Sequence, residues 1–216
     1  MNKYLPYYPP PNENNNTGSG VIHGRANSFL KQIKISDVLF WQNDIKEIDP
    51  LKINELTIQF VQKYPFYGQA TTNNGIIAYH SLTKRVLNNR DAKPTILIHS
   101  NNQNCVYVET PFYLKDGHAA TSVLQNPYLN KYIALYLITA IRKVIRNKFN
   151  YNAKATKIAL KMTDIELPYT SNTTPDYAFM ERFMQAVHKL VIKDVVEWTD
   201  KKMKAYRKVV FDESKV

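Results

Sequence analysis

The apolar pattern of this chain changes its period near residue 125, and this change limits the folds that the chain can adopt. Between Phe29 and about Leu124 the apolar residues form short or alternating runs bounded by turn residues, which is typical of β-strands. These runs lie at 66–67, 75–79, 95–99, 105–108 and 111–114. Beyond them the apolar residues recur every three or four positions, which is typical of amphipathic helices. We therefore predict an α+β fold, in which a mixed β-rich globule is followed by a long C-terminal helix.

Short polar segments are expected to connect the strands. Asn74-Gly75 predicts a two-residue hairpin turn of type I′, because both central positions of that turn need positive φ. Asp116-Gly117 is a second turn candidate, and Asn101–Asn104 are expected to form a polar loop between two strands.

Two helices are predicted in the second half of the chain. The first begins with Asn126 as its cap and Pro127 in its first turn, and it runs to about Lys148. A short strand or extended link, 156–168, leads to a second helix that begins at Thr174-Pro175 and runs to about Trp198. The charged tail beyond it continues the helix or frays. An apolar stripe on the second helix, called the seam below, has the spacing of a helix-packing surface. It consists of Met180, Met184, Val187, Val191, Val195 and Trp198.

Composition excludes several classes of protein. Cys105 is the only cysteine, so the chain has no internal disulfide and no cysteine-cluster metal site. No apolar run approaches the roughly 20 residues that span a bilayer. Residues 1–28 are rich in Pro and Asn, lack the order of a signal peptide and are interpreted as a flexible leader. A cytoplasmic protein is expected.

Catalytic patterns are missing from the sequence. The chain has only 6 glycines and no glycine-rich phosphate loop. Asn126-Pro127-Tyr128 lacks the second proline of an amino-methyltransferase tetrad, and a helix cap explains it better. Pro175-Asp176 has no Glu-x-Lys partner except in the terminal tail, and the five histidines show no metal-ligand spacing. We expect no catalytic residue, no metal and no cofactor on this chain.

The charge distribution favours an anionic partner. The formal net charge is +11, and no acidic residue lies between Asp116 and Asp164. Basic residues accumulate there, interleaved with Asn and aromatic residues. This pattern fits the neutralisation of phosphates by basic side chains, with neighbouring polar groups free to contact sugars or base edges. The candidate contacts in this stretch are Arg146, Lys148, Tyr151, Lys154 and Lys157. A solvated helix face is the alternative interpretation.

Two amide-rich loops are candidates for reading bases, because Asn and Gln pair bidentately with adenine in the major groove. The alternative is that Asn is simply a good turn residue, which we prefer for Asn74. The first loop contributes Gln69, Thr71, Thr72 and Asn73, and the second contributes Asn101, Asn102, Gln103 and Asn104. Lys84 and Arg85 complete the candidate DNA-contacting set.

Together these segments resemble the target-recognition domains of restriction-modification specificity subunits, of type I and of the BcgI-like type II branch. The matching segments cover roughly residues 29–198. In the first half they are 29–40, 64–76 with the Asn-Gly, and 94–99. In the second half they are the helix 130–148 with Phe149-Asn150-Tyr151, and Ile165-Glu166-Leu167-Pro168 followed by Pro175-Asp176-Tyr177-Ala178-Phe179-Met180. Two departures stand out: amides replace glycines at 101–104, and the type I Glu-Gln continuation after Leu-Pro is absent. The second departure points to the type II-like branch.

The resemblance implies a division into a leader (1–28), a target-recognition domain (29–168) and a spacer or dimerisation helix with its tail (169–216). It implies a half-subunit that binds duplex DNA and catalyses nothing. A partner methyltransferase subunit would use S-adenosylmethionine, and a nuclease subunit would cut unmodified sites. The seam would pack on a second copy or on methyltransferase helices, and packing on the β-rich domain is the alternative. An orphan module that occupies partner subunits without reading DNA is the alternative function.

Overall fold

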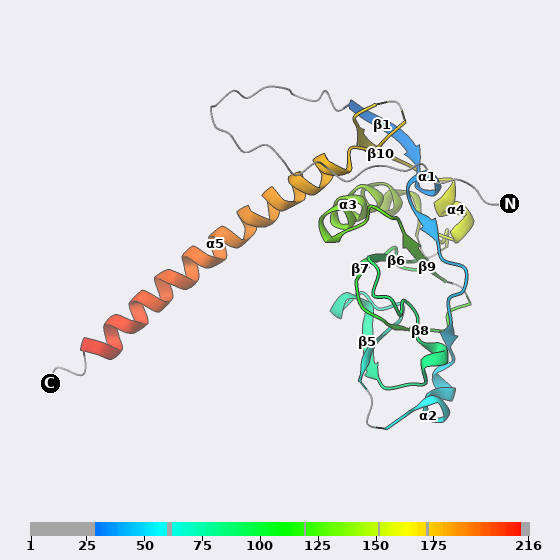
Figure 1. The fold of residues 1–216 in the computed structure, drawn as a ribbon, viewed down its shortest axis with the longest axis horizontal. Coiled ribbons are helices and arrows are strands. Elements are labelled where there is room, and N and C mark those ends of the chain that lie inside the picture. Colours follow the sequence, from blue (N-terminus) through cyan, green and yellow to red (C-terminus); the bar gives the residue numbers. More distant parts are fainter. Residues whose placement is uncertain (1–28, 60–61, 119, 151, 172, 213–216) are drawn as a thin grey trace.

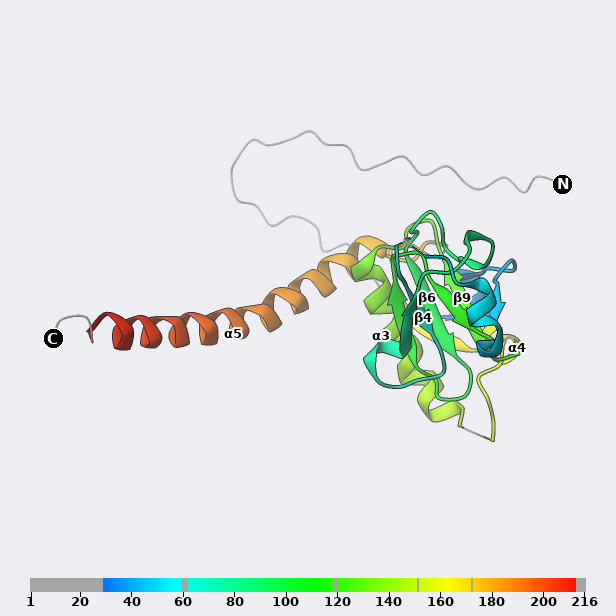
Figure 2. The ribbon, with the colours of Figure 1, turned by 90° about the horizontal axis from the view of Figure 1, so that it is seen from below.

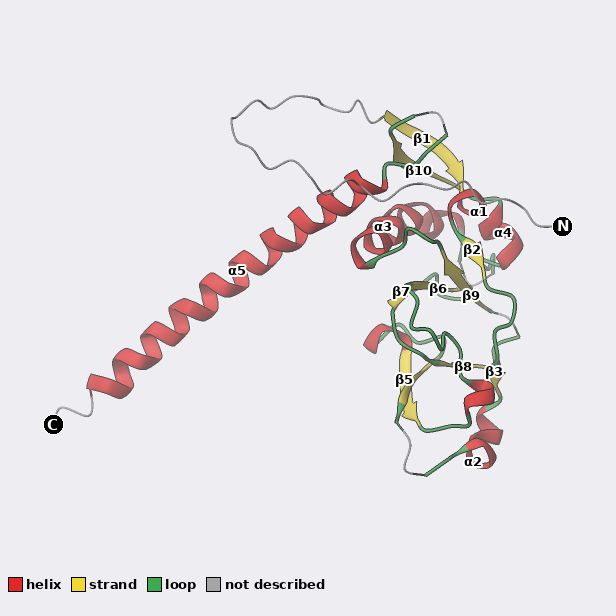
Figure 3. Cartoon of the chain, in the orientation of Figure 1, coloured by secondary structure: helices red, strands yellow, loops and turns green. Residues whose placement is uncertain are grey.

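The computed structural model describes residues 29–59, 62–118, 120–150, 152–171 and 173–212, and side chains as far as residue 207. The expected leader, 1–28, therefore lies outside the described residues. Short strands and small helices form a globule, and one long helix leaves it (Figure 1). The predicted α+β class is confirmed, with all strands but β10 (Asp164–Tyr169) before residue 126 and most helix after it (Figure 3).

Ten strands are described: β1 (Phe29–Lys34), β2 (Phe40–Trp41), β3 (Glu47–Ile48), β4 (Tyr64–Tyr67), β5 (Ile76–His80), β6 (Thr95–His99), β7 (Cys105–Val108), β8 (Tyr113–Lys115), β9 (Thr121–Gln125) and β10 (Asp164–Tyr169). The α-helices are α1 (Ile35–Val38), α2 (Ile53–Leu56), α3 (Lys131–Lys148), α4 (Lys157–Lys161) and α5 (Tyr177–Asp212). Short 3-10 turns are η1 (Pro50–Lys52), η2 (Asn73–Gly75) and η3 (Lys84–Val86). The predicted runs 95–99 and 105–108 coincide with β6 and β7.

The strands form three sheets. The central sheet has the order β2-β9-β6-β7 and is antiparallel throughout. A second sheet, β3-β8-β4-β5, is mixed: β8 is parallel to β3 and β4, whereas β4 and β5 form an antiparallel hairpin. The third sheet pairs β1 with β10 over six residues, from Phe29 opposite Tyr169 to Lys34 opposite Asp164. The described chain therefore enters and leaves the globule side by side, where α5 begins (Figure 1).

Both faces of the central sheet are buried, and this explains the continuous apolar run of β6. Ile96 and Ile98 point into the main core cluster together with the apolar face of α3. Leu97 points to the opposite face, into a cluster with Leu114 of the second sheet and with Phe112, which precedes β8. Since side chains alternate along a strand, a strand covered on both faces needs apolar residues at every position. The central sheet is thus the middle layer between α3 and the second sheet.

The helix α3 begins four residues later than its expected first position, Pro127. Asn130 is the cap, and its side chain accepts hydrogen bonds from the backbone N–H groups of Tyr132 (2.9 Å) and Ile133 (3.0 Å). Asn126 instead accepts from the backbone of Tyr128 (2.7 Å), which stabilises a turn before the helix. Two Asn residues four positions apart both suit a helix start, and packing of the 126–129 turn decides between them.

The segment 156–168 is not a single extended link. Thr156 accepts a hydrogen bond from the backbone of Ala159 (3.3 Å) and caps the short helix α4, and β10 follows. The second long helix begins after Asp176, whose carboxylate accepts from the backbone of Phe179 (2.8 Å).

The helix α5 is longer than the sequence pattern predicts. It contains 36 residues and continues past Trp198 to Asp212, so at 1.5 Å per residue it is about 54 Å long. Only its first turns pack on the globule, and the rest projects away from it (Figures 1 and 2). None of the described helices has the length and apolar content needed to cross a membrane.

Candidate nucleic-acid interface

Four segments that are far apart in sequence converge at one end of the central sheet. They are the β4–β5 connection (68–75), the β6–β7 loop (100–104), the β8–β9 turn and the irregular segment 152–156 after α3. The backbone N–H of Ser100 donates to Ala120 O (2.8 Å), and Ala155 N–H donates to Ser100 O (3.0 Å). This loop end brings together both amide-rich loops and the segment that carries Lys154.

Gln69 lies at the centre of the loop end. Its amide nitrogen is 3.0 Å from Thr121 Oγ1, 3.2 Å from His99 Nδ1 and 3.4 Å from Ala120 O. Its amide oxygen accepts from the backbone N–H of Asn101 (3.4 Å). Gln69 therefore joins the first loop to the second and to β9, so it is half-buried rather than displayed.

The amides of the second loop are also directed into the protein. Asn102 Nδ2 donates to Gln69 O (2.9 Å), while its Oδ1 accepts from Asn104 N–H (3.0 Å). Asn104 Nδ2 donates to Ala70 O (3.3 Å), and Gln103 Nε2 donates to Ser100 O (3.0 Å). All four residues, 101–104, are half-buried. The predicted loop between two strands is confirmed, and its side chains fix the neighbouring loop.

The tip of the first loop has the opposite character. Thr71, Thr72, Asn73 and Asn74 are all exposed. Asn73 (φ 47°) and Asn74 (φ 50°) are left-handed, and Gly75 N–H donates to Thr72 O (2.9 Å), which closes a turn around the two Asn residues. The predicted hairpin is present, but its turn is centred on Asn73-Asn74 rather than Asn74-Gly75, inside an eight-residue connection between Tyr67 and Ile76. Asn tolerates this conformation better than other non-glycine residues.

His99, one of the five histidines that show no metal-ligand spacing in the sequence, is a component of the loop end. The residue is fully buried at the end of β6, and burial lowers the pKa of its imidazole to about 4. Thr121 Oγ1 lies 3.0 Å from its Nδ1, whereas its Nε2 has no hydrogen-bond partner among the described residues. A Cβ added at Gly75, which has φ +81°, would lie 3.2 Å from that Nε2. The feature of the sequence that could have identified this residue is a single histidine at the end of an otherwise apolar strand.

Most basic candidates lie on the C-terminal half of α3 and on the segment that follows it. Arg142 and Arg146 line a shallow cleft of about 410 Å³ with Lys143. Their charges also reach the buried Cys105 on β7, where they oppose the effect of burial that raises its pKa to about 12. Lys148 Nζ donates to Thr163 Oγ1 (3.2 Å). Arg146, Lys148 and Lys154 are exposed and Lys157 is half-buried, whereas Tyr151 lies outside the described residues.

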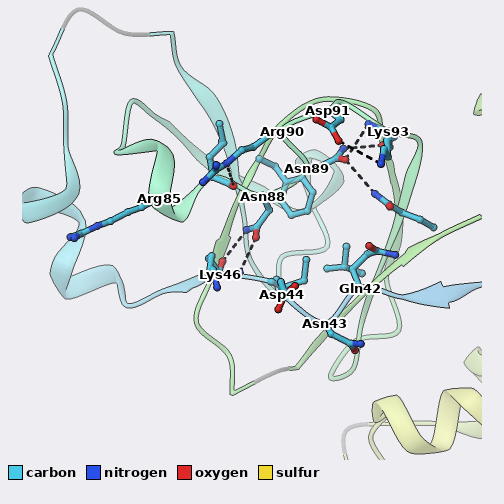
Figure 4. Close-up of a pocket in the computed structure, with 15 residues that line it drawn as sticks. Gln42, Asn43, Asp44, Lys46, Arg85, Asn88, Asn89, Arg90, Asp91 and Lys93 are labelled. Atoms are coloured by element: carbon cyan, nitrogen blue, oxygen red, sulfur yellow. Dashed lines mark hydrogen bonds and ion pairs between the residues drawn. The ribbon is translucent and has the colours of Figure 1, made fainter. Parts of the chain in front are cut away.

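Lys84 and Arg85 lie apart from the loop end. They belong to η3, and Arg85 lines a pocket of about 400 Å³ beside the start of β6, whereas the amide loops follow the end of that strand. Most polar groups of this pocket maintain the local fold: Asn88 bonds both backbone groups of Lys46 (2.8 and 2.9 Å). Arg85 extends away from the other labelled side chains (Figure 4). The sequence-based candidates are thus divided between two ends of the globule.

The seam on α5 changes its environment along the helix. Met180 is fully buried in the main core and belongs to its own domain rather than to a surface for a partner. Met184 and Val187 are half-buried. Val191, Val195 and Trp198 are 61%, 59% and 58% exposed, so the distal seam has no cover within the described chain.

Metal chemistry has no candidate centre in the described part of the chain, which holds no group of three or more His, Cys, Asp or Glu side chains suited to binding an ion.

Known proteins share the sequence pattern of this chain. The family model described as Type I restriction modification DNA specificity domain matches residues 38–197. The type II restriction enzyme BgcI specificity subunit S.BcgI of Heyndrickxia coagulans is 28% identical over 138 residues, which are 62% of this chain and 38% of that protein. A crystal structure of a type I restriction-modification system S subunit from M. genitalium aligns with a TM-score of 0.49 and 16% identity, over 80% of this chain and 41% of that one. The chain thus spans about two-fifths of the length of either relative.

Proposed function

The chain belongs to the type I restriction modification DNA specificity domain family, and from this premise we propose that it recognises a specific duplex DNA sequence and directs partner subunits to it. The observation that carries the proposal is the loop end, where the first loop, with its exposed tip 71–74, is hydrogen-bonded to the second loop, and the second loop is hydrogen-bonded to the segment that carries Lys154. The tip can contact base edges, and the basic residues of that segment and of α3 can contact phosphates.

The proposed mechanism divides the contacts into two kinds. Arg146, Lys148, Lys154 and Lys157 neutralise phosphates, which gives affinity without sequence preference. Polar side chains of the loop end then supply hydrogen bonds to bases, which give the preference. Lys84 and Arg85 are proposed to contact the backbone further along the duplex, since they lie at the other end of β6, a five-residue strand of about 16 Å.

Chemistry is proposed to reside in partners. A methyltransferase subunit with S-adenosylmethionine would modify the recognised site, and a nuclease subunit would cut unmodified sites, in the cytoplasm. This chain would determine the DNA site at which the reaction takes place and would contribute no catalytic group.

The distal seam is the proposed assembly surface. Val191, Val195 and Trp198 form an exposed apolar row on a helix that projects from the globule. A second copy that pairs along this row would hold two recognition domains in one assembly, each contacting half of a site. Exposing an apolar row to water costs free energy, and burying the row against the same helix of a second copy removes that cost.

Selection from a pool of random duplex DNA tests the recognition proposal. The protein, alone and co-expressed with its modification subunit, retains duplexes that are then sequenced, and an enriched short motif is expected. Retention without a motif would reduce the function to non-specific binding. No retention under either condition would favour the orphan module.

Salt dependence tests the phosphate contacts. Replacing Lys148 and Lys154 together with Ala should weaken binding to all sequences alike and lower the slope of log affinity against log salt by about 2, since each contact contributes about 0.9. Lys52→Ala, an exposed lysine of η1, is the matched control. An unchanged slope in the double variant would remove both lysines from the interface.

A further inference from the structure

The two amide-rich loops at the loop end differ in what their side chains are free to bind. We propose that the tip Thr71–Asn74 is the base-reading element, and that the loop Asn101–Asn104 with Gln69 and His99 positions the tip without reading bases. This inference rests on the proposed function, because it assigns the specificity-determining residues of the same site.

Three of the four amide donors of the second loop are already used, and Asn101 supports the first loop through its backbone N–H, which donates to Gln69. Bidentate pairing with adenine needs one amide donor and the amide acceptor of the same side chain. Asn102 commits its donor group to Gln69 O and its oxygen to Asn104 N–H. Asn104 and Gln103 each donate to a backbone carbonyl, of Ala70 and Ser100 respectively. Reading a base with these three amides would leave the carbonyls of Gln69, Ala70 and Ser100 without these donors.

Gln69 is fixed in one orientation by groups on both sides. Its nitrogen faces the carbonyl of Ala120 and its oxygen faces the N–H of Asn101, so the amide cannot be reversed without losing both contacts. Because that nitrogen only donates, its 3.2 Å contact with His99 favours the tautomer in which Nδ1 accepts. In that tautomer the proton is on Nε2, which has no hydrogen-bond partner among the described residues and leaves little room for a Cβ at Gly75. His99 is a positioning residue, because it holds Gln69 and lies close to Gly75, which follows the tip.

The tip is the part of the loop end whose side chains remain available. Asn73 Nδ2 donates back to Ile76 O (3.3 Å), which stabilises the turn. Thr71, Thr72 and Asn74 are exposed, and their side chains have no hydrogen-bond partner among the described residues. A Thr hydroxyl can donate to or accept from a base edge, and an Asn amide can pair bidentately with adenine. Their position is set by the backbone contacts of Gln69 and Ala70, which the second loop supplies.

Paired variants separate reading from positioning. Thr72→Val keeps the shape of an extended residue, and Asn74→Gly keeps the left-handed backbone while removing the side chain. Asn102→Ala removes the support contacts, and Asn104→Ala is a milder second support variant that loses a single side-chain hydrogen bond, the one to Ala70 O. Circular dichroism melts check that each variant folds. Each protein is measured twice, by motif selection from random duplex DNA and by hydrogen exchange of the DNA-free protein.

The proposal predicts opposite results for the two groups. The tip variants should keep the exchange protection of residues 68–75 and lose about ten-fold or more of the discrimination at one or two motif positions. The support variants should raise exchange at 69–75 about ten-fold and weaken discrimination at every position, with the same preferred bases. The proposal is overturned if tip variants leave the motif intact, or if Asn102→Ala changes a preferred base while loop exchange is unaltered.

Failure of the proposed function gives a different result. If the unaltered protein selects no motif, the recognition role fails and the reading role of the tip fails with it. Exchange in the support variants still reports the positioning role by itself, because that measurement needs no DNA. Unchanged exchange in both support variants would refute the positioning role even where a motif is found.

Discussion

Lowering the pH from about 7 to about 5 should destabilise the fold mainly through one side chain, His99. Its imidazole is fully buried at the end of β6, and burial lowers its pKa to about 4. Gln69 Nε2 lies 3.2 Å and Thr121 Oγ1 lies 3.0 Å from its Nδ1. Protonation would turn Nδ1 into a donor that faces the Gln69 amide donor, and it would place a charge in a buried site where Nε2 has no hydrogen-bond partner among the described residues.

The sign and size follow from the two pKa values. In the unfolded chain His99 has its ordinary pKa of 6.5, above the value of about 4 in the fold, so the unfolded chain binds more protons between these limits. Stability from this group is therefore complete above about pH 6.5, falls as the pH is lowered, and levels off below about pH 4. The loss is about 2 kcal/mol by pH 5 and about 3 kcal/mol in total.

Urea unfolding in steps from about pH 7 to about pH 5 measures this loss, with fluorescence of Trp41, whose indole bonds Ser122 in the globule, as one signal. His99→Gln is the control, because it removes the titrating group while the other histidines remain. Its absolute stability can differ, so the comparison concerns the slope against pH. Equal losses in the two proteins would refute the assignment of the slope to His99.

Three further predictions concern stability. Gly75→Ala should cost about 1–3 kcal/mol, because φ is +81° and the new Cβ would lie 3.2 Å from a buried imidazole nitrogen; a thermal melt measures it, and a neutral result would mean that the turn relaxes freely. Tyr113→Phe removes both hydrogen bonds to the backbone of Leu82 (2.8 and 2.9 Å) and should lower the free energy of unfolding, measured in urea, by about 1–3 kcal/mol. A smaller loss would indicate that water replaces the hydroxyl. Met180→Ala should cost about 2–5 kcal/mol, against about 0.5 kcal/mol or less for the exposed Val191→Ala; similar losses would contradict the different burial of the two.

The arrangement of α5 decides how the seam is divided. The spacing of Met180 to Trp198 indicated one packing surface, and the structure splits it into a buried start and an exposed remainder. Periodicity identifies which face of a helix is apolar, but it carries no information on where the globule ends. That boundary is set mainly by α3, whose Tyr136 packs on Phe179 and Phe183 and whose Tyr132 packs on His188.

Local patterns in the sequence were enough to determine the fold class, the strands β6 and β7, the loop between them and the two long helices, because these depend on the spacing of apolar residues and on turn chemistry. The same patterns identified the amide-rich loops as polar but could not determine which way their side chains point. That was decided by tertiary structure, since Asn102 and Asn104 find their acceptors on a loop 33 and 34 residues earlier in the chain. A polar side chain satisfied by a distant backbone and one left free for a ligand look alike in sequence, because the difference lies in a partner brought near only by the packing of the sheets.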